Sequence, residues 1–355
     1  MTSGESLRRQ TRLLIGCLAS LLLAGCDQIQ QFFNGPPAPP PPPPVAQQAP
    51  PPPPPMAAPM PAAPDPADMV ARFQKLQSHE KTDGAISALA AVPEAAAQVV
   101  ELTLDASPVT DLSGSEFGKF PNLRKLSLQG TKITDKTISA LAPLAQLAEL
   151  NLNDCVITDA SIPDVVKLRQ LRFLSLLRTR ISESACAAFG ELPLLEYLNI
   201  GGVGSITGEG FTKSVKGGGY RSLKTLICAG TGFAAFGLER VKALTQLEKL
   251  VLYDCGVNDR GLKWICQCGQ LKELQLNANA ISDIGMADVD NLKNLEILSV
   301  PGCKGVTNKS FNTIKNMKQL KELSVDGTSC TLEAAKQLKA KWLKNTKIRI
   351  ESKEI

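Results

Sequence analysis

One sequence phrase recurs ten times between Val99 and Asn345, and it constrains the fold more than any other feature of the chain. Each copy begins L-x-x-L-x-L, continues with Thr, Cys or Asn after a short gap, and ends in an I-T-D-like triplet and a helical segment. Most copies are 24 residues long, a period typical of a solenoid whose units contact only their neighbours. The copies begin at Val99, Leu123, Leu147, Leu171, Leu195, Leu223, Leu247, Leu271, Leu295 and Leu320.

The second unit, residues 123–146, predicts the structure of the others. Leu126 and Leu128 alternate with polar residues, which indicates a short strand with its leucines pointing inward. Thr134 and Asp135 predict a helix start, because a hydroxyl caps the first turn and a carboxylate suits the positive end of the helix dipole. Strands that recur in one direction with helices between them form a parallel sheet. The sequence therefore predicts a right-handed α/β solenoid with a concave parallel β-sheet and convex helices.

The repeat also carries a family resemblance. Residues 257–262 (V-N-D-R-G-L) and 281–285 (I-S-D-I-G) resemble the bacterial and cysteine-containing leucine-rich repeat families, which follow L-x-x-L-x-L-x-x-[TC]-x-I-T-D-x-G-L. The resemblance covers residues 99–345 and implies a leucine-rich repeat horseshoe that acts as a binding scaffold. We expect residues 67–98 to form an N-terminal helical cap and residues 346–355 a capping strand and tail.

The N-terminal residues 1–25 have the composition of a signal peptide. Three arginines precede the apolar run 13–23, which is too short to span a bilayer because that takes roughly 20 residues. The tetrapeptide L-A-G-C ending at Cys26 resembles the lipobox of bacterial lipoproteins, which implies cleavage before Cys26 and its lipidation. The chain would then be anchored to a bacterial membrane in the cell envelope, with the membrane and leaflet open. The alternatives are an uncleaved signal anchor and an ordinary secreted protein.

Residues 26–66 follow as a lipidated cysteine and a proline-rich disordered stalk. Residues 36–66 contain 18 of the 25 prolines, so they favour polyproline II over helix or sheet. At about 3.1 Å per residue this stretch reaches on the order of 90 Å. We expect it to hold the folded part away from the lipid surface; a ligand for proline-binding modules is the alternative.

Composition excludes several functions. Removing residues 1–25 takes away three arginines and one glutamate, which lowers the net charge from +5 to +3. Without a basic run containing aromatic residues, we expect no nucleic acid partner. His79 is the only histidine, which argues against Ser-His-Asp and Cys-His catalysis and against histidine-rich metal sites. We therefore expect no enzymatic activity, no cofactor and no metal.

Two further features have a structural interpretation. Cys155, Cys255 and Cys303 occupy the ninth position of their units, where the family bonds backbone between strand and turn. We expect the repeat cysteines to be free core thiols, the others being Cys186, Cys228, Cys266, Cys268 and Cys330. The glycine-rich residues 217–220 of the fifth unit predict an inserted loop.

The outward strand positions change character along the chain. In units one to three they are all polar, whereas units four to seven carry a predicted ligand-binding patch of Phe173, Leu177, Arg178, Tyr197, Ile227, Val251, Tyr253 and Asp254. Aromatic and arginine anchors in a polar surround are typical of binding hot spots, although such residues also simply favour strands. We predict a monomeric, membrane-anchored module that binds a protein or peptide. The alternatives are a structural envelope spacer and a glycan-binding protein.

Overall fold

The structure is a computed structural model that describes residues 65–213, 219–233 and 237–355. The predicted signal peptide, Cys26 and nearly all of the predicted stalk lie outside the described residues. Within the described part of the chain, no helix combines the length and the apolar character that crossing a membrane requires.

The repeats build a single 12-stranded sheet whose strands follow one another in chain order. Strands β1 to β11 are parallel and in register, and β12 pairs antiparallel with β11. The strands are β1 (Glu101–Thr103), β2 (Lys125–Ser127), β3 (Glu149–Asn151), β4 (Phe173–Ser175), β5 (Tyr197–Asn199), β6 (Thr225–Ile227), β7 (Lys249–Val251), β8 (Glu273–Gln275), β9 (Ile297–Ser299), β10 (Glu322–Ser324), β11 (Lys347–Ile350) and β12 (Lys353–Glu354).

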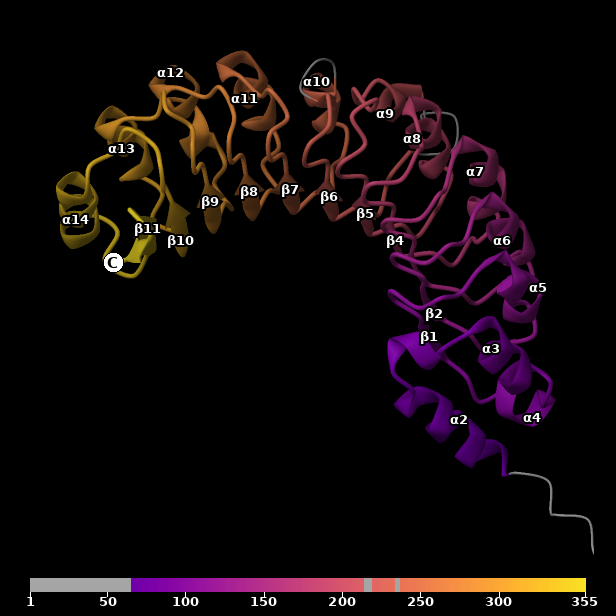
Figure 1. The fold of residues 1–355 in the computed structure, drawn as a ribbon. Coiled ribbons are helices and arrows are strands. Elements are labelled where there is room, and N and C mark those ends of the chain that lie inside the picture. The colour runs from indigo at the N-terminus through magenta and orange to yellow at the C-terminus, as the bar shows by residue number, and fades with distance from the viewer. Residues whose placement is uncertain (1–64, 214–218, 234–236) are drawn as a thin grey trace, which may run out of the picture. The chain divides into compact units, whose positions relative to one another are not determined.

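Helices return the chain from each strand to the next. Figure 1 shows the strands along the concave side of the repeat body and the helices along its convex side, which confirms the predicted leucine-rich repeat solenoid. The helices are α2 (Pro66–Lys75), η1 (Ser78–Glu80), α3 (Asp83–Ala90), α4 (Pro93–Ala96), η2 (Asp111–Ser113), α5 (Gly114–Phe117), α6 (Asp135–Ala140), η3 (Asp159–Ser161), α7 (Ile162–Val165), α8 (Glu183–Phe189), α9 (Gly210–Lys213), α10 (Leu238–Val241), α11 (Asp259–Ile265), α12 (Asp283–Met286), η6 (Val289–Asn291), η7 (Asn308–Ser310), α13 (Phe311–Ile314) and α14 (Leu332–Lys341).

The core is a column of leucines from the strand centres. Leu126, Leu150 and Leu174 are register partners on successive strands and are fully buried. Burying one such side chain contributes about 1.5–3 kcal/mol, and no unit can bury its leucine without a neighbour. The period-two pattern therefore predicts both the strand within each unit and the stacking of one unit on the next.

A ladder of hydrogen bonds, which the sequence interpretation missed, joins successive units on the convex side. Thr134 caps α6 as predicted, and its amide and hydroxyl also donate to Asp111 of the preceding unit, at 2.8 and 2.6 Å. Thr158 donates in the same way to Asp135, at 2.9 and 2.6 Å. The helix-start carboxylate thus binds the next unit, beyond any interaction with its own helix dipole.

Both ends of the solenoid are closed. Helices α2, α3 and α4 precede the first strand, and Pro66 starts α2 after its cap Asp65. The Lys81 ammonium donates to the Thr103 carbonyl on the edge strand β1, at 3.0 Å. At the other end, Lys347 and Arg349 are exposed on β11 as predicted. The tail that follows β11 includes a further short strand, β12, which pairs with β11.

The eight described cysteines are free thiols, seven of them buried and Cys330 half-buried. The thiols of Cys155 and Cys255 each donate to a strand-end carbonyl of the preceding unit, at 3.0 Å. Burial raises the pKa of Cys266 to about 12 and that of Cys268 to about 11. Protonated, buried thiols are structural groups rather than nucleophiles.

The glycine-rich insertion of the fifth unit is more than a surface loop where the structure describes it. Tyr220 is 2% exposed, donates its hydroxyl to the Cys186 carbonyl and stacks on Phe211 with ring centroids 4.8 Å apart. Phe233 meets Phe211 edge to face at 5.3 Å. These three residues, the central aromatic cluster, anchor the return of the chain to the core.

Candidate ligand-binding surface

The concave face is organised in rows, because equivalent positions of successive strands are register partners. The third-position row comprises Glu101, Lys125, Glu149, Phe173, Tyr197, Thr225, Lys249, Glu273, Ile297, Glu322 and Lys347. Its charges alternate and pair, for example Lys125 with Glu101 at 2.8 Å and Lys249 with Glu273 at 2.9 Å. Strands β4 to β6 interrupt this row with three consecutive uncharged side chains.

Phe173 and Tyr197, the aromatic pair, occupy that interruption. They are half-buried register partners, and their rings stack with centroids 4.2 Å apart and 12° between their planes. Stacked rings stabilise each other by about 0.5–1.5 kcal/mol beyond their burial. Burial raises the pKa of Tyr197 above its ordinary value, which already lies well above neutral pH. The phenol therefore carries its proton and can donate a hydrogen bond to a ligand. The pair is a rigid apolar surface with one polar group.

The predicted residues Ile227 and Val251 lie together in the fifth-position row. They are register partners on β6 and β7, and Ile227 is also the partner of Asn199 on β5. Ile227 is half-buried, whereas only 5% of Val251 is exposed. The structure therefore corrects the prediction for Val251, which packs against its neighbours and offers almost no surface to a ligand.

Leu177 and Arg178 lie at the end of β4, over the glycines of the next unit. A Cβ atom at Gly201 would come within 3.0 Å of Leu177 Cδ1, and one at Gly202 within 2.6 Å of Arg178 Cγ. The Arg178 guanidinium forms a bidentate ion pair with Asp154, at 2.6 and 2.8 Å. Arg178 is thus a paired charge at the rim. Its partner Asp154 was missed, although opposite charges one repeat apart were the available signal.

The strand ends have a special backbone that the repeat shares. The eighth position of every unit has a positive φ. Five of the ten are glycines and five are not, Arg178 (φ 55°) and Asp254 (φ 48°) among them. L-residues rarely adopt this left-handed conformation, so it fixes where these two side chains leave the sheet. The Asp254 carboxylate has no hydrogen-bond or ion-pair partner among the described residues.

Tyr253 does not join the aromatic pair. It is the seventh residue of its unit and lies just after β7. Strand β6 separates it from Tyr197, and 36% of its surface is exposed. Its hydroxyl donates to Gln275, whose amide donates to Glu273. The structure thus divides the predicted patch into an aromatic centre on β4 and β5 and a separate polar position at Tyr253.

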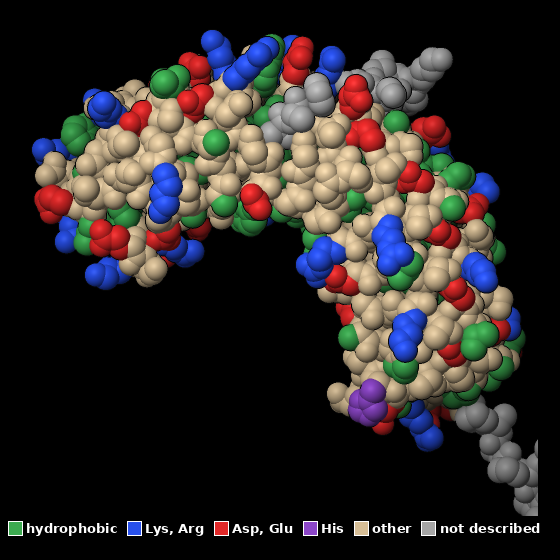
Figure 2. Space-filling model, turned by 45° about the horizontal axis from the view of Figure 1, so that its top comes forward, with side chains coloured by type: hydrophobic (Ala, Val, Ile, Leu, Met, Phe, Trp, Pro, Cys, Tyr) green, Lys and Arg blue, Asp and Glu red, His purple; other side chains and the backbone are tan. Residues whose placement is uncertain are grey.

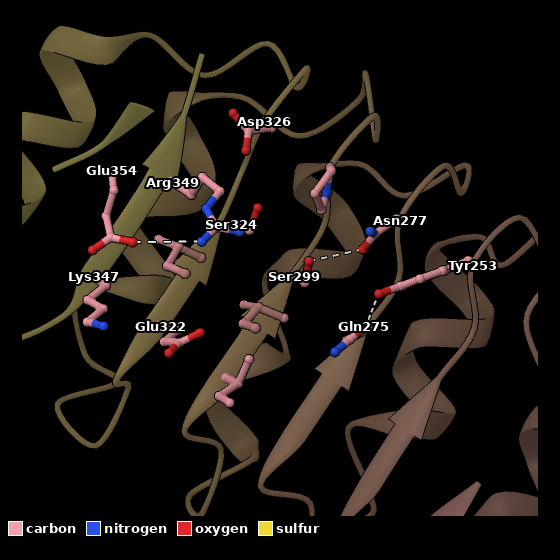
Figure 3. Close-up of a pocket in the computed structure, with 14 residues that line it drawn as sticks. Tyr253, Gln275, Asn277, Ser299, Glu322, Ser324, Asp326, Lys347, Arg349 and Glu354 are labelled. Carbon is pink, nitrogen blue, oxygen red and sulfur yellow. Dashed lines mark hydrogen bonds and ion pairs between the residues drawn. The ribbon is translucent and has the colours of Figure 1, made fainter. Parts of the chain in front are cut away.

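Tyr253 instead borders a hollow that the sequence interpretation missed (Figure 3). This C-terminal hollow has a volume of about 330 Å³. The short side chains of Ser299 and Ser324 lie between Tyr253 on one side and Arg349 with Glu354 on the other. Outward serines on consecutive strands were the available signal. The complete lining is Tyr253, Gln275, Asn277, Ile297, Leu298, Ser299, Pro301, Glu322, Leu323, Ser324, Asp326, Lys347, Arg349 and Glu354.

The electrostatics of the surface are mixed in sign. Arg349 pairs with Glu354 at 3.7 Å, and the backbone amide of Ser352 donates to Asp326 at 2.7 Å. On the face that Figure 2 shows, basic and acidic side chains are interspersed. Among the described residues, no group of three or more His, Cys, Asp or Glu side chains could hold a metal ion. The sole histidine, His79, lies in η1 of the N-terminal cap.

Comparisons with known proteins agree with this fold. A leucine-rich repeat family model matches residues 121–142. A Trypanosoma equiperdum protein, whose name gives it a provisional role as an adenylate cyclase regulatory protein, is 32% identical over 146 residues, or 40% of this chain. The chain spans about a fifth of the length of that curated relative, 21%.

Two bacterial structures resemble the solenoid. An internalin from Listeria monocytogenes is 18% identical, with a TM-score of 0.52 over 76% of this chain and 89% of that one. A leucine-rich repeat protein from Leptospira interrogans is 16% identical, with a TM-score of 0.52 over 72% of this chain and 74% of that one. At these identities the likeness shows the fold alone. The ten repeats, the continuous sheet and these likenesses establish that the chain has a leucine-rich repeat fold.

Proposed function

We propose that this protein is a lipid-anchored binding module of the bacterial cell envelope, which recognises a protein or peptide through its concave face. The aromatic pair Phe173–Tyr197 is the centre of the contact. The observation that carries the proposal is the position of this pair: two stacked, half-exposed rings lie where the charged third-position row is interrupted.

The physical reason is the cost of leaving such a pair in water. Aromatic side chains supply large apolar area with little conformational freedom to lose, and binding energy concentrates on a few such residues inside a polar rim. Glu149 flanks the pair on one side and, beyond Thr225, Lys249 flanks it on the other. A ligand segment with an apolar centre and charged flanks complements this arrangement.

A peptide or protein fits this surface better than a glycan. Glycan sites commonly stack a sugar on an exposed aromatic face, whereas Phe173 and Tyr197 cover each other's faces at 4.2 Å. The two tryptophans lie elsewhere, Trp264 in α11 and Trp342 at the end of α14. No cofactor or catalytic group is part of the proposal.

The anchoring half of the proposal rests on the sequence. The tetrapeptide ending at Cys26 follows an apolar run with arginines before it, and residues 36–66 supply a proline-rich spacer. Replacement by Cys26→Ser should move the protein from the membrane fraction to the soluble fraction of the envelope. Retention of the serine variant in the membrane fraction would contradict lipidation at this residue.

The binding half is tested with the double variant Phe173→Ala/Tyr197→Ala. Wild type and variant, both with their native anchor, are used to capture envelope proteins after cross-linking in cells, and the partners are compared. The matched control is Leu112→Ala/Ile284→Ala, which removes apolar side chains that are 80% and 77% exposed in the convex elements η2 and α12. We expect the first variant to lose its main partner and the control to retain it.

Two outcomes decide against the concave face. Identical partners for wild type and the Phe173→Ala/Tyr197→Ala variant would contradict the proposed site, provided that both melt at similar temperatures. If removal of residues 36–64, which leaves α2 and its cap Asp65 intact, reproduces the phenotype of a strain without the protein while partner capture is unchanged, the protein acts as an envelope spacer instead.

A further inference from the structure

A second charged row runs along the side of the solenoid, at the residue before each of the strands β2 to β10. This second-position row comprises Arg124, Ala148, Arg172, Glu196, Lys224, Glu248, Lys272, Glu296 and Lys321. From Arg172 onward its charges alternate without exception. Four of the neighbouring pairs are ion pairs; Glu248 and Lys272, for example, are 3.0 Å apart and Glu296 and Lys321 2.7 Å apart.

Ala148 interrupts this alternation. It lies between two arginines, where the pattern calls for an acidic residue. Its amide donates to the Arg124 carbonyl, and its carbonyl accepts from the Arg172 amide, both at 2.8 Å. The two arginines are therefore one repeat away on either side of a methyl group, and no carboxylate of the row lies between them.

A hollow of about 470 Å³ lies at this interruption. Its lining contains two arginines and no acidic side chain among the described residues: Arg124, Ala145, Gln146, Ala148, Gln170 and Arg172. The Arg124 guanidinium donates only to the neutral amide oxygen of Gln146, at 3.3 Å. Arg172 uses one of its nitrogens, Nη1, for Glu196 at 2.6 Å. Most guanidinium donors on both walls are thus left for another group.

Glu196 shows what fills such a position elsewhere in the row. Its two carboxylate oxygens bridge cations that are two repeats apart, Arg172 at 2.6 Å and Lys224 at 2.8 Å. The hydrogen bond from Lys224 is the largest cause that lowers the pKa of Glu196, with Arg172 adding to it. A carboxylate at the level of Ala148 would meet the same arrangement, with two guanidinium groups in place of one.

We propose that this arginine notch, formed by Arg124, Ala148 and Arg172, binds a glutamate or aspartate side chain from an acidic segment of a partner protein. The bound carboxylate occupies the position that Glu196 holds between its own two cations. Arginine forks bind carboxylates bidentately, which favours this ligand over a simple point anion. Gln146 and Gln170 flank the notch with amide groups suited to a peptide backbone. The notch lies beside the sheet and does not depend on the aromatic pair.

The decisive variant is Ala148→Glu, which supplies the absent carboxylate from within the chain. The probe is a fluorescein-labelled oligo-glutamate peptide, and its affinity is measured by fluorescence anisotropy at low ionic strength. We expect Ala148→Glu to weaken binding about tenfold or more, because the internal carboxylate pairs with both arginines. Its melting temperature should equal or exceed that of the wild type, so misfolding would not explain the loss.

Two controls separate the notch from general charge effects. Ala148→Gln has a similar size without the charge and should bind almost as well as the wild type. Ala280→Glu adds the same charge at an exposed alanine in the turn after β8, and should also have little effect. Arg124→Gln and Arg172→Gln should each weaken binding, and Phe173→Ala/Tyr197→Ala should not.

Three results would overturn the proposal. The first is undiminished oligo-glutamate binding by Ala148→Glu. The second is equal weakening by Ala148→Glu and Ala280→Glu, which would show that only net charge matters. The third is equal affinity of the wild type for an oligo-lysine peptide. The notch is tested by oligo-glutamate binding and the concave site by partner capture with Phe173→Ala/Tyr197→Ala, so failure of one is distinguishable from failure of the other.

Discussion

The outer repeats and the central repeats of this solenoid are joined to their neighbours by different chemistry. In the outer units, a helix-start carboxylate accepts hydrogen bonds from the amide and hydroxyl of the next unit, as Asp111 does from Thr134 and Asp283 from Thr307. Between units five and six, the central aromatic cluster of Phe211, Tyr220 and Phe233 fills the space. Among the described residues, no carboxylate–hydroxyl contact of this kind joins units six and seven.

The difference teaches how a repeat protein can vary one junction without losing the fold. A polar ladder needs a carboxylate and a hydroxyl at fixed positions one repeat apart, whereas an aromatic cluster needs only volume. The aromatic pair lies on β4 and β5, and the units of these two strands are still joined by a polar contact, in which the amide and hydroxyl of Thr207 donate to Glu183. The aromatic cluster joins the next two units, so unit five is the one that departs from the repeat both on the inner face and in the core.

The largest expected effect comes from opening the central cluster. Phe233→Ala removes a fully buried ring, and we expect it to lower the free energy of unfolding by about 3–5 kcal/mol. Denaturant unfolding followed by circular dichroism measures the change. Phe233→Leu, which keeps most of the volume, should cost less than half as much. A loss below about 1 kcal/mol for the alanine variant would show that the cluster does not join the units.

Breaking one rung of the outer ladder should cost less. Asp111→Ala leaves the amide and hydroxyl of Thr134 and the hydroxyl of Thr137 without their acceptor, so we expect a loss of about 1–3 kcal/mol. Asp111→Asn retains one acceptor oxygen and should lie between the wild type and the alanine variant. If all three proteins are equally stable in denaturant unfolding, the hydrogen bonds to Asp111 do not stabilise the junction between the units.

The two kinds of junction should respond differently to pH. Burial by itself raises the pKa of Asp111, but hydrogen bonds from Thr134 and Thr137 lower it by more, and Asp83, Asp159 and Asp283 behave alike. Because the pKa is lower in the folded state, these carboxylates stabilise the fold fully above their unfolded pKa of about 3.9. Their contribution is lost as the pH falls through the lower, folded pKa.

Thermal melting between neutral pH and the acid range tests this response. We expect the wild type to lose stability as the pH falls below about 4 and Asp111→Ala to lose less over the same interval. The effect of Phe233→Ala should be the same at every pH, since no titrating group is removed. Equal acid sensitivity of the wild type and the Asp111→Ala protein would contradict the role of the carboxylate.

The smallest expected effect concerns the one polar contact of the central cluster. Tyr220→Phe keeps the ring against Phe211 but removes the hydrogen bond to the Cys186 carbonyl, so we expect a loss of about 0.5–1.5 kcal/mol. Tyr220→Leu, which also removes the stacking, should lose clearly more in the same unfolding experiment. If the two variants are equally stable, the hydroxyl and not the ring anchors the insertion.

Most of the fold was predictable because its signals are local. The strand pattern around Leu126, the cap at Thr134 and the alternation of Lys347 to Ile350 each depend on a few neighbouring residues. The glycines of the fifth unit's insertion predicted a loop but not the packing of Tyr220, which contacts Phe211 and Cys186, nine and 34 residues away. The hydrogen bonds from Thr134 to Asp111 were missed for the same reason, because they join residues 23 positions apart.

The candidate site was predictable in composition and less so in geometry. Register alone places Phe173 beside Tyr197, since equivalent positions of adjacent units meet. Three other facts depend on neighbours that differ from unit to unit: the burial of Val251, the pairing of Arg178 with Asp154, and the contact of Tyr253 with Gln275. The C-terminal hollow needed both the small side chains on β9 and β10 and the turn that brings Glu354 beside Arg349.

The repeat period is enough to establish the solenoid, the direction of its strands and the row to which each side chain belongs, because hydrophobic burial selects one register for every unit. It does not establish which members of a row touch, which charges are already paired, or where a row is left open. Those properties arise from contacts roughly one repeat apart, where the identity of two side chains and the space between them decide the outcome. The aromatic pair and the arginine notch are both of this kind.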